Sequence, residues 1–244
     1  MIILKNNHSN YLENKSVKDV FGAYLLDEAQ FDGYYDIPVV NTPDDIHLPS
    51  KLVSYSKLNS EECDDYTYCH FYQNDYTFDG RDGIWNSLIQ NTQFSRGFNL
   101  DKMNKVYAVI CPDFSTYYDM PRVMQIWNIY RSRAVGCALI KLGYIAVPNV
   151  RWTDKKSYAY SFLGIRKNSV VAVSTLGCLR AKVDKEFFYP GFIELIKRVH
   201  PSCIIIYGSL TDELKDILNE YHQNYVFFPA QIAVAMEAKY GNEG

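Results

Sequence analysis

The chain has 244 residues, a formal net charge of −3 and a hydrophobic fraction of 48%, which suits one globular domain with a buried core. No segment approaches the roughly 18 consecutive apolar residues of a membrane span, and the apolar start turns polar after four residues, so we expect neither a membrane anchor nor a secretory signal. The six cysteines are scattered along the chain, which favours reduced thiols and a cytoplasmic protein.

Charges are distributed unevenly along the chain. Residues 1–100 carry 7 Lys and Arg against 15 Asp and Glu, whereas residues 101–200 carry 16 against 7. A basic segment beside an acidic one is typical of a protein that contacts a polyanion, so we expect DNA or a nucleotide to bind through residues 101–200. The alternative is that the acidic and basic parts neutralise each other within the fold.

The first part of the chain has several turn signals and little periodicity. Residues 1–60 are predicted to form an N-terminal arm or cap packed on the core, with a helical pattern only at 17–26. Residues 61–244 are predicted to form a single α/β domain. Aromatic residues alternate over 66–72, which predicts the first strand of the sheet, and a short helix is expected at 84–93.

From residue 106 onward, apolar strand-like segments alternate with helical ones. Strands are predicted at 106–111, 144–148, 169–175, 203–207 and 225–228, and helices at 121–142, 185–199, 212–222 and within the tail after 229. Asp119 and Thr211 lie near the starts of two of these helices, where they are expected to cap free backbone amides. This alternation predicts a mostly parallel β/α sheet, either open with three layers or curled into a partial barrel.

Polar residues follow two neighbouring strands at the point where each strand ends. Asp113 follows the first of them, and Asn149 and Arg151 follow the second. The carboxyl ends of neighbouring parallel strands form one crevice, where ligands bind, so we expect these three side chains to share a site. Asp113 suits a general base or an electrostatic stabiliser, and Asn149 suits recognition of the edge of a base. They are the two predicted catalytic residues.

The predicted substrate-binding residues lie at or near the same strand ends. Arg151 suits a phosphate, Trp152 suits stacking on a base, and Arg122 lies near a helix start, where free amides favour anions. The complete set is Phe114, Ser115, Arg122, Arg151, Trp152, Thr175, Tyr207 and Ser209. Structural roles are the alternative, because Asp and Asn are common turn formers and Arg151 suits a surface salt bridge.

Recognisable motifs for cofactors and metals are missing. The chain has no phosphate-binding P-loop, no glycine-rich dinucleotide motif after a strand and no nucleophile elbow. Cys63, Cys69 and His70 lack a second pair of ligands at a usable spacing, so we expect no zinc site, no other metal and no cofactor. A metal-dependent hydrolase remains open only if four aspartates converge on one ion, namely Asp75, Asp79, Asp113 and Asp119.

Several segments resemble, as a set, the domain-of-unknown-function family 4417 of bacteria, phages and mobile elements. The most specific ones are PDFSTYYDMP, which begins at residue 112, and PNVRW, which begins at residue 148. The resemblance covers about residues 31–229 and implies a cytoplasmic α/β protein of roughly this size, without a chemistry to transfer. The chain departs from the family pattern by an insertion at 81–83 and an acidic linker at 61–62.

The first function that these residues suggest is a base-excising DNA N-glycosidase. Asp113 would stabilise the oxocarbenium-like sugar and orient water, Asn149 would recognise the extruded base, and Phe114 or Trp152 would stack on it. A strand-end Asp followed by a strand-end Asn is broadly similar to the uracil-DNA glycosylases. The His-Pro-Ser segment at 200–202 departs from that pattern, because it precedes a strand.

The second function is a non-catalytic module that binds a nucleotide or a protein in phage defence or counter-defence. The 21 tyrosines favour it, because tyrosine offers apolar area with a polar tip at a binding surface. The sequence favours no particular oligomeric state.

Overall fold

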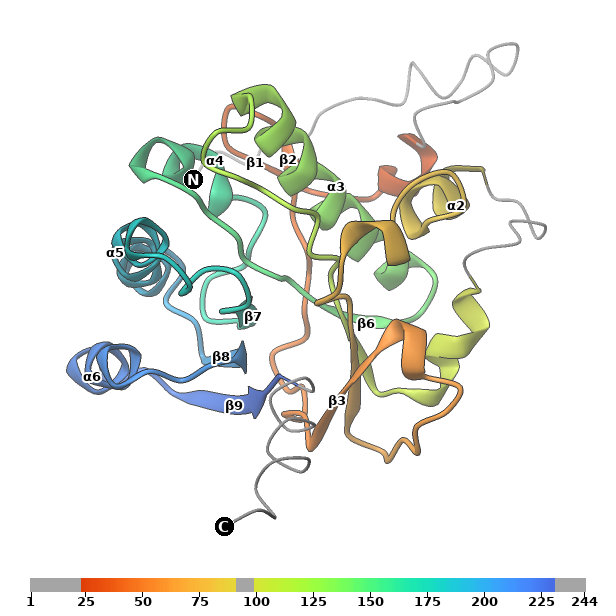
Figure 1. The fold of residues 1–244 in the computed structure, drawn as a ribbon. Helices are drawn as coiled ribbons and strands as arrows, with labels where there is room; N and C mark the ends of the chain where they lie inside the picture. Colours follow the sequence, from red (N-terminus) through yellow and green to blue (C-terminus); the bar gives the residue numbers. More distant parts are fainter. Residues whose placement is uncertain (1–22, 91–98, 231–244) are drawn as a thin grey trace.

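The computed structural model describes residues 23–90 and 99–230 (Figure 1). Of the helical pattern at 17–26, the described part, Ala23–Leu26, is a 3-10 helix, and the helix expected in the tail lies outside the described residues. Two short strands, β1 (Phe31–Asp32) and β2 (Ile37–Pro38), pair antiparallel after it. None of the described helices is long and apolar enough to span a membrane.

Within the described residues, parallel strands in two adjoining sheets form the centre of the fold (Figure 1). The first sheet has the order β3 (Lys51–Ser54), β4 (Thr67–His70), β5 (Ala108–Ile110) and β6 (Ile145–Val147). The second has the order β7 (Val170–Ser174), β8 (Cys203–Gly208) and β9 (Tyr225–Pro229). A parallel bridge between Asn149 and Ala172 joins the two sheets. Every pair within them is parallel, which confirms the prediction.

Helices connect these strands and cover the outer face of the sheets. They are α2 (Ile84–Gln90), α3 (Arg122–Lys141), α4 (Tyr158–Ser161), α5 (Lys182–Val199) and α6 (Asp212–Glu220). In Figure 1, α5 and α6 lie beside β7, β8 and β9, and α3 lies on the other sheet. The β/α alternation from residue 106 onward is therefore confirmed, with bounds that differ from the predicted ones by a few residues.

The two sheets curl around one inner core, so that the fold is a partial barrel. Alternate strand residues point inward and form one apolar cluster, which includes Leu52, Tyr68, Ile110, Val147, Ala172 and Ile205. Their sequence neighbours pack outward with the helices, as Val53 and Ile204 do. No pairing between the described strands β3 and β9 closes the barrel.

Residues 51–54 differ from the prediction for the N-terminal region. They form β3, the edge strand, so the strand predicted at 66–72 is the second of its sheet and not the first. The segment before β3 is also tied into the core, because the Thr42 hydroxyl donates to the Ala146 carbonyl at 2.8 Å. The sequence of β3, KLVS, places its two apolar residues side by side and has no alternation that would indicate a strand.

One of the two predicted helix caps is confirmed and the other is wrong. Thr211 Oγ1 accepts a hydrogen bond from a backbone amide in the first turn of α6. Asp119 is exposed, and α3 has no side-chain cap at its start. The side chain of Gln125 instead holds the loop before α3 by donating to two of its carbonyls at 2.9 and 2.8 Å.

Candidate functional site

Side chains that follow three neighbouring strands meet at the carboxyl end of the partial barrel. Asn149, after β6, donates through Nδ2 to Oδ1 of Asp113, after β5, at 2.8 Å. Tyr72, after β4, donates its hydroxyl to Oδ1 of Asn149 at 3.0 Å. Arg151 and Cys178 complete this group, which we call the strand-end cluster. The structure thus brings Asp113, Asn149 and Arg151 together, at the place that their strand positions predict.

Arg151 and Asp113 form a two-point ion pair. Nε and Nη2 of Arg151 donate to Oδ1 and Oδ2 of Asp113 at 2.7 and 2.6 Å. The side chain of Asp113 is 7% exposed and that of Arg151 is 19% exposed. Burial opposes the charge on Arg151, but the carboxylate outweighs burial and raises the pKa of the guanidinium. With the bond from Asn149, Asp113 uses three of its roughly four lone pairs within the protein.

Cys178 lies at the outer side of this ion pair, in the loop after β7. Arg151 Nη1 donates to its Sγ at 2.7 Å. Burial raises the pKa of the Cys178 thiol, and the charge of Arg151 offsets part of that effect. The thiol is therefore protonated at neutral pH and is not an activated nucleophile.

An aromatic stack underlies the cluster. The ring of Tyr72 stacks on Tyr207 of β8 with centroids 5.1 Å apart, and the His70 ring lies 4.6 Å from Tyr207. Burial raises the pKa of Tyr72 well above its ordinary value, so the phenol remains a hydrogen-bond donor. Burial also lowers the pKa of His70 to about 3, so that ring is neutral.

The neutral His70 ring has a defined tautomer. Its Nδ1 accepts a hydrogen bond from the Tyr72 backbone amide at 3.1 Å, so its proton lies on Nε2. Nε2 is buried and has no hydrogen-bond partner among the described residues. Sequence reasoning missed Tyr72 and Cys178 as neighbours of Asp113, and His70 as a ring in the stack beneath them. The rule that the carboxyl ends of parallel strands share one site would have found His70 and Tyr72, because they lie at the carboxyl end of β4.

Arg133 supports the cluster from α3. Its side chain is fully buried and donates to the carbonyls of Asn149, Ser161 and Leu163 at 2.6, 3.4 and 3.2 Å. Burial lowers the pKa of Arg133 to about 10, which leaves it charged at neutral pH. Since these carbonyls belong to the chain that follows β6, Arg133 fixes the backbone that positions Asn149.

Phe114 and Trp152, the predicted stacking residues, pack elsewhere. Phe114 is buried in the outer core, with the Arg131 guanidinium 4.0 Å over its ring. Trp152 packs on α5 and donates Nε1 to two carbonyls of that helix at 3.3 and 3.2 Å. Gly191 leaves room for the indole, because a Cβ there would lie 2.1 Å from Trp152 Nε1. Neither ring is placed to stack on a ligand of the strand-end cluster.

The other predicted binding residues have partners within the protein. Ser115 binds the Asp75 carboxylate through its amide and hydroxyl at 3.1 and 2.8 Å. Arg122 pairs with an aspartate of the loop after β6. Thr175 Oγ1 accepts a hydrogen bond from the Ser209 amide at 2.6 Å, which ties the end of β7 to that of β8. Of this group, Ser209 is exposed at the rim beside the cluster.

Acids from elsewhere in the chain neutralise part of the basic segment. Three of its cations pair with acids from the first hundred residues: Arg131 with Asp79, Arg166 with Asp44 and Lys141 with Asp27. These pairs favour mutual neutralisation over a polyanion surface. Three of the four aspartates considered for a metal have separate partners, and the fourth, Asp119, is exposed. The described part of the chain has no group of three His, Cys, Asp or Glu side chains that could hold an ion.

Comparison with known proteins identifies a family and phage relatives. A family model described as a domain of unknown function (DUF4417) matches residues 29–225. Two relatives, each named Gene 1 protein, come from Mycobacterium phages L5 and D29 and are 36% and 33% identical over 141 residues. The match covers 58% of this chain and 57% and 48% of theirs, so the chain spans about half the length of these curated relatives. No solved structure matches the chain.

Proposed function

We propose, from the premise that the chain belongs to the domain of unknown function family DUF4417, that this member binds a nucleotide at the strand-end cluster. The supporting observation is the continuous hydrogen-bonded chain from Tyr72 through Asn149 and Asp113 to Arg151. It lies at the carboxyl ends of parallel strands, where open β/α sheets bind ligands. Because its side chains already hold one another in place, little conformational freedom is lost on binding.

One edge of the cluster reaches solvent and suits a phosphate. Arg151 keeps 19% of its side chain exposed, and Gly177 and Ser209 in the neighbouring loops are exposed. The guanidinium has five N–H donors, of which three bind Asp113 and Cys178. The two remaining N–H donors suit an anionic group, because arginine binds phosphate through a planar pair of donors.

The loop that follows Asp113 offers aromatic rings for a base. Tyr117 and Tyr118 are 59% and 54% exposed. The Tyr118 ring lies 5.7 Å from Phe187 near the start of α5, which sets this loop beside the loop that holds Cys178. Exposed tyrosines stack on bases without sequence preference. In this proposal they take the role that the sequence suggested for Phe114 or Trp152.

The state of Asp113 favours binding over turnover. A carboxylate that stabilises a sugar cation or orients water needs free oxygen lone pairs directed at the substrate. The ion pair with Arg151 and the bond from Asn149 occupy three of the roughly four available. Binding requires no change in this network, whereas base excision has to rely on the one lone pair that remains on Asp113 or on a break in its pair with Arg151.

A base-excising DNA N-glycosidase is the second candidate. The contact of 2.8 Å between Asp113 and Asn149 favours it, because an acid and an amide at neighbouring strand ends are the two groups that the reaction needs. Its test is the appearance of abasic sites in duplex DNA that carries modified bases. Cleavage by the wild type and loss of cleavage in Asp113→Asn would support it.

Thermal unfolding with a panel of nucleotides tests the binding proposal. A ligand at one hundred times its Kd stabilises the native state by about 2.7 kcal/mol, which raises the Tm of a chain of this size by roughly 5–10 °C. We expect nucleoside monophosphates to raise the Tm, and nucleosides without phosphate to raise it less. Chromatography after incubation should return the nucleotide unchanged.

Two variants make this test specific. Arg151→Lys keeps the charge but removes the planar fork, so the Tm shift should disappear. Asp79→Asn removes an acid from an ion pair of similar burial with Arg131 and should keep the shift. Absence of a shift with every nucleotide, or equal shifts in wild type and Arg151→Lys, would refute binding at this cluster.

A further inference from the structure

A cavity of about 490 Å³ lies at the opposite end of the strands from the strand-end cluster. Arg166 and Lys167 line it and come shortly before β7, and Val199 lines it at the end of α5, shortly before β8. The cavity therefore opens near the amino ends of β7 and β8. Its volume lies in the range of about 300–1,000 Å³ that is usual for small-molecule sites.

The walls of this cavity are mostly apolar and partly aromatic. They come from β1, α4 and the chain between α4 and β7, and include Phe31, Tyr158, Phe162, Leu163 and Ile165. The Arg198 guanidinium lies over the rings of Tyr158 and Phe162, at 5.9 and 5.7 Å from their centroids. Such walls suit a flat or aliphatic body, since the burial of apolar area is the main source of affinity in small-molecule sites.

The charged groups of the cavity are mostly cations held in place. Arg166 donates to the Thr42 carbonyl at 2.8 Å and to Asp44, and Arg198 donates to Glu194 at 2.8 Å. Neither of these two acids lines the cavity. Since both guanidinium groups are fixed by the protein, a ligand does not have to immobilise them.

Lys167 and Asp32 are the remaining charged groups of the wall. Lys167 is exposed and has no ion pair or hydrogen bond among the described residues. Asp32 is engaged, because its Oδ2 accepts the Gly164 amide at 3.1 Å. The lining thus has three cations and one acid, with one cation free to bind.

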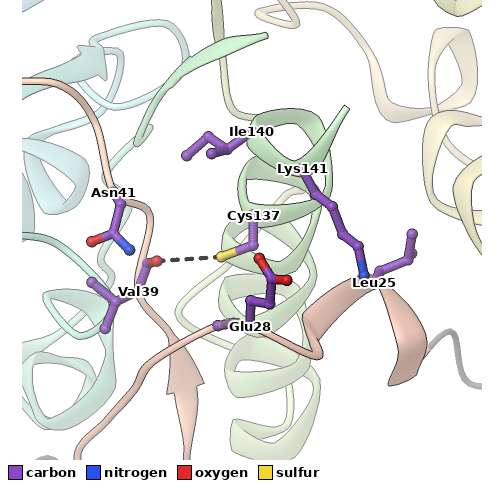
Figure 2. A pocket seen from close by; sticks show the side chains of 8 residues that line it. Leu25, Glu28, Val39, Asn41, Cys137, Ile140 and Lys141 are labelled. Atoms are coloured by element: carbon purple, nitrogen blue, oxygen red, sulfur yellow. Dashed lines mark hydrogen bonds between the residues drawn. The ribbon is translucent and has the colours of Figure 1, made fainter. Parts of the chain in front are cut away.

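A second, smaller cavity provides a contrast (Figure 2). It has a volume of about 170 Å³ and shares Val39 and Asn41 with the larger one. Its charged lining residues are Glu28 and Lys141, so its charges balance. The Cys137 thiol donates to the Val39 carbonyl at 3.3 Å, as Figure 2 shows, and burial raises the pKa of that thiol to about 12. Nothing in the smaller cavity selects an anion.

We infer that the larger cavity is a second ligand site, which binds a small organic anion with an apolar body. The anionic group lies against Lys167, the lining cation that has no acid paired with it among the described residues, and the apolar body lies against the aromatic wall. Carboxylates and phosphate monoesters share this chemistry. This site is independent of the proposed nucleotide binding, because none of its lining residues belongs to the strand-end cluster.

Three probes with the same apolar body test the inference: 1-naphthoate, 1-naphthyl phosphate and the neutral 1-naphthamide. We expect at least one of the two anions to raise the Tm of the full chain and to show saturable binding by calorimetry, and the amide to bind at least tenfold more weakly. The better of the two anions identifies the charged group as a carboxylate or a phosphate. Equal binding of the amide, or binding of none of the probes, would overturn the inference.

Matched variants locate the binding. Lys167→Ala should weaken binding of the anion about tenfold, whereas Lys156→Ala removes an exposed lysine that does not line the cavity and should leave it unchanged. Ala159→Trp fills the mouth of the cavity from an exposed position and should abolish binding. Arg151→Lys should leave binding of the anion in this cavity unchanged, which separates this site from the strand-end cluster. Equal loss in Lys167→Ala and Lys156→Ala would refute the assigned site.

Discussion

Removal of Asp113 should leave the Arg151 charge buried without its counter-ion. The two side chains are 7% and 19% exposed, so solvent screens the pair only slightly. Loss of one partner of a buried ion pair costs about 3–5 kcal/mol, because the other charge stays desolvated. For a chain of this size, this corresponds to a fall in Tm of roughly 6–20 °C. We therefore expect Asp113→Ala and Arg151→Ala each to destabilise the fold by that amount.

A double-mutant cycle separates the ion pair from other effects of the substitutions. The variant with both side chains truncated should cost at least about 2 kcal/mol less than the sum of the two single variants, because no unpaired charge remains. Urea unfolding followed by far-ultraviolet circular dichroism gives the free energy of each variant. Glu194→Ala, which removes one partner of the solvent-exposed pair with Arg198, should cost less than about 1 kcal/mol. Losses of less than about 1 kcal/mol in the single variants, or additive losses in the double variant, would show that Asp113 and Arg151 do not form a buried ion pair.

Further predictions concern pH, packing and helix caps. The pKa of His70 is lowered to about 3, so the unfolded chain binds its proton first as the pH falls, and stability present above about pH 6.5 is lost toward pH 3. Lowering the pH from 7 to 4.5 should therefore reduce the free energy of unfolding by about 2–3 kcal/mol through His70. In urea unfolding, His70→Gln should remove this part of the pH dependence, and His47→Gln should not. Gly191→Ala should cost about 1–3 kcal/mol through overpacking against Trp152, and Trp152→Phe in the same chain should recover part of the loss of Tm; an unchanged Tm in Gly191→Ala would contradict the packing. Thr211→Ala should cost about 1 kcal/mol as a lost cap, whereas Asp119→Ala should leave the unfolding free energy unchanged, and equal losses would contradict the assigned caps.

The sequence predicts the part of the fold that depends on local pattern. The segment that forms β8 is recognisable because it is a continuous apolar run, and the helix that follows Thr211 is recognisable by its helical periodicity and its cap residue. The meeting of Asp113 and Asn149 is also predictable, since parallel strands place their carboxyl ends on one edge. Only the order of neighbouring strands had to be assumed.

Features set by contacts distant in sequence could not be predicted. The direction of the Trp152 ring depends on Gly191, a residue 39 positions later in a helix whose packing partner the sequence does not reveal. The partner of Arg131 is Asp79, 52 positions earlier. β3 has no alternation of apolar and polar residues in its sequence, and only its pairing with β4 decides its place in the sheet. In each case tertiary packing, and not local preference, fixes the outcome.

A crystal structure of the protein soaked with a nucleoside monophosphate tests the central proposal most directly. We expect the phosphate to bind the remaining donors of Arg151 and the base to stack on Tyr117 or Tyr118, with the Asp113–Asn149 contact unchanged. An empty strand-end cluster at saturating nucleotide, or a nucleotide bound only in the cavity beside Lys167, would contradict it.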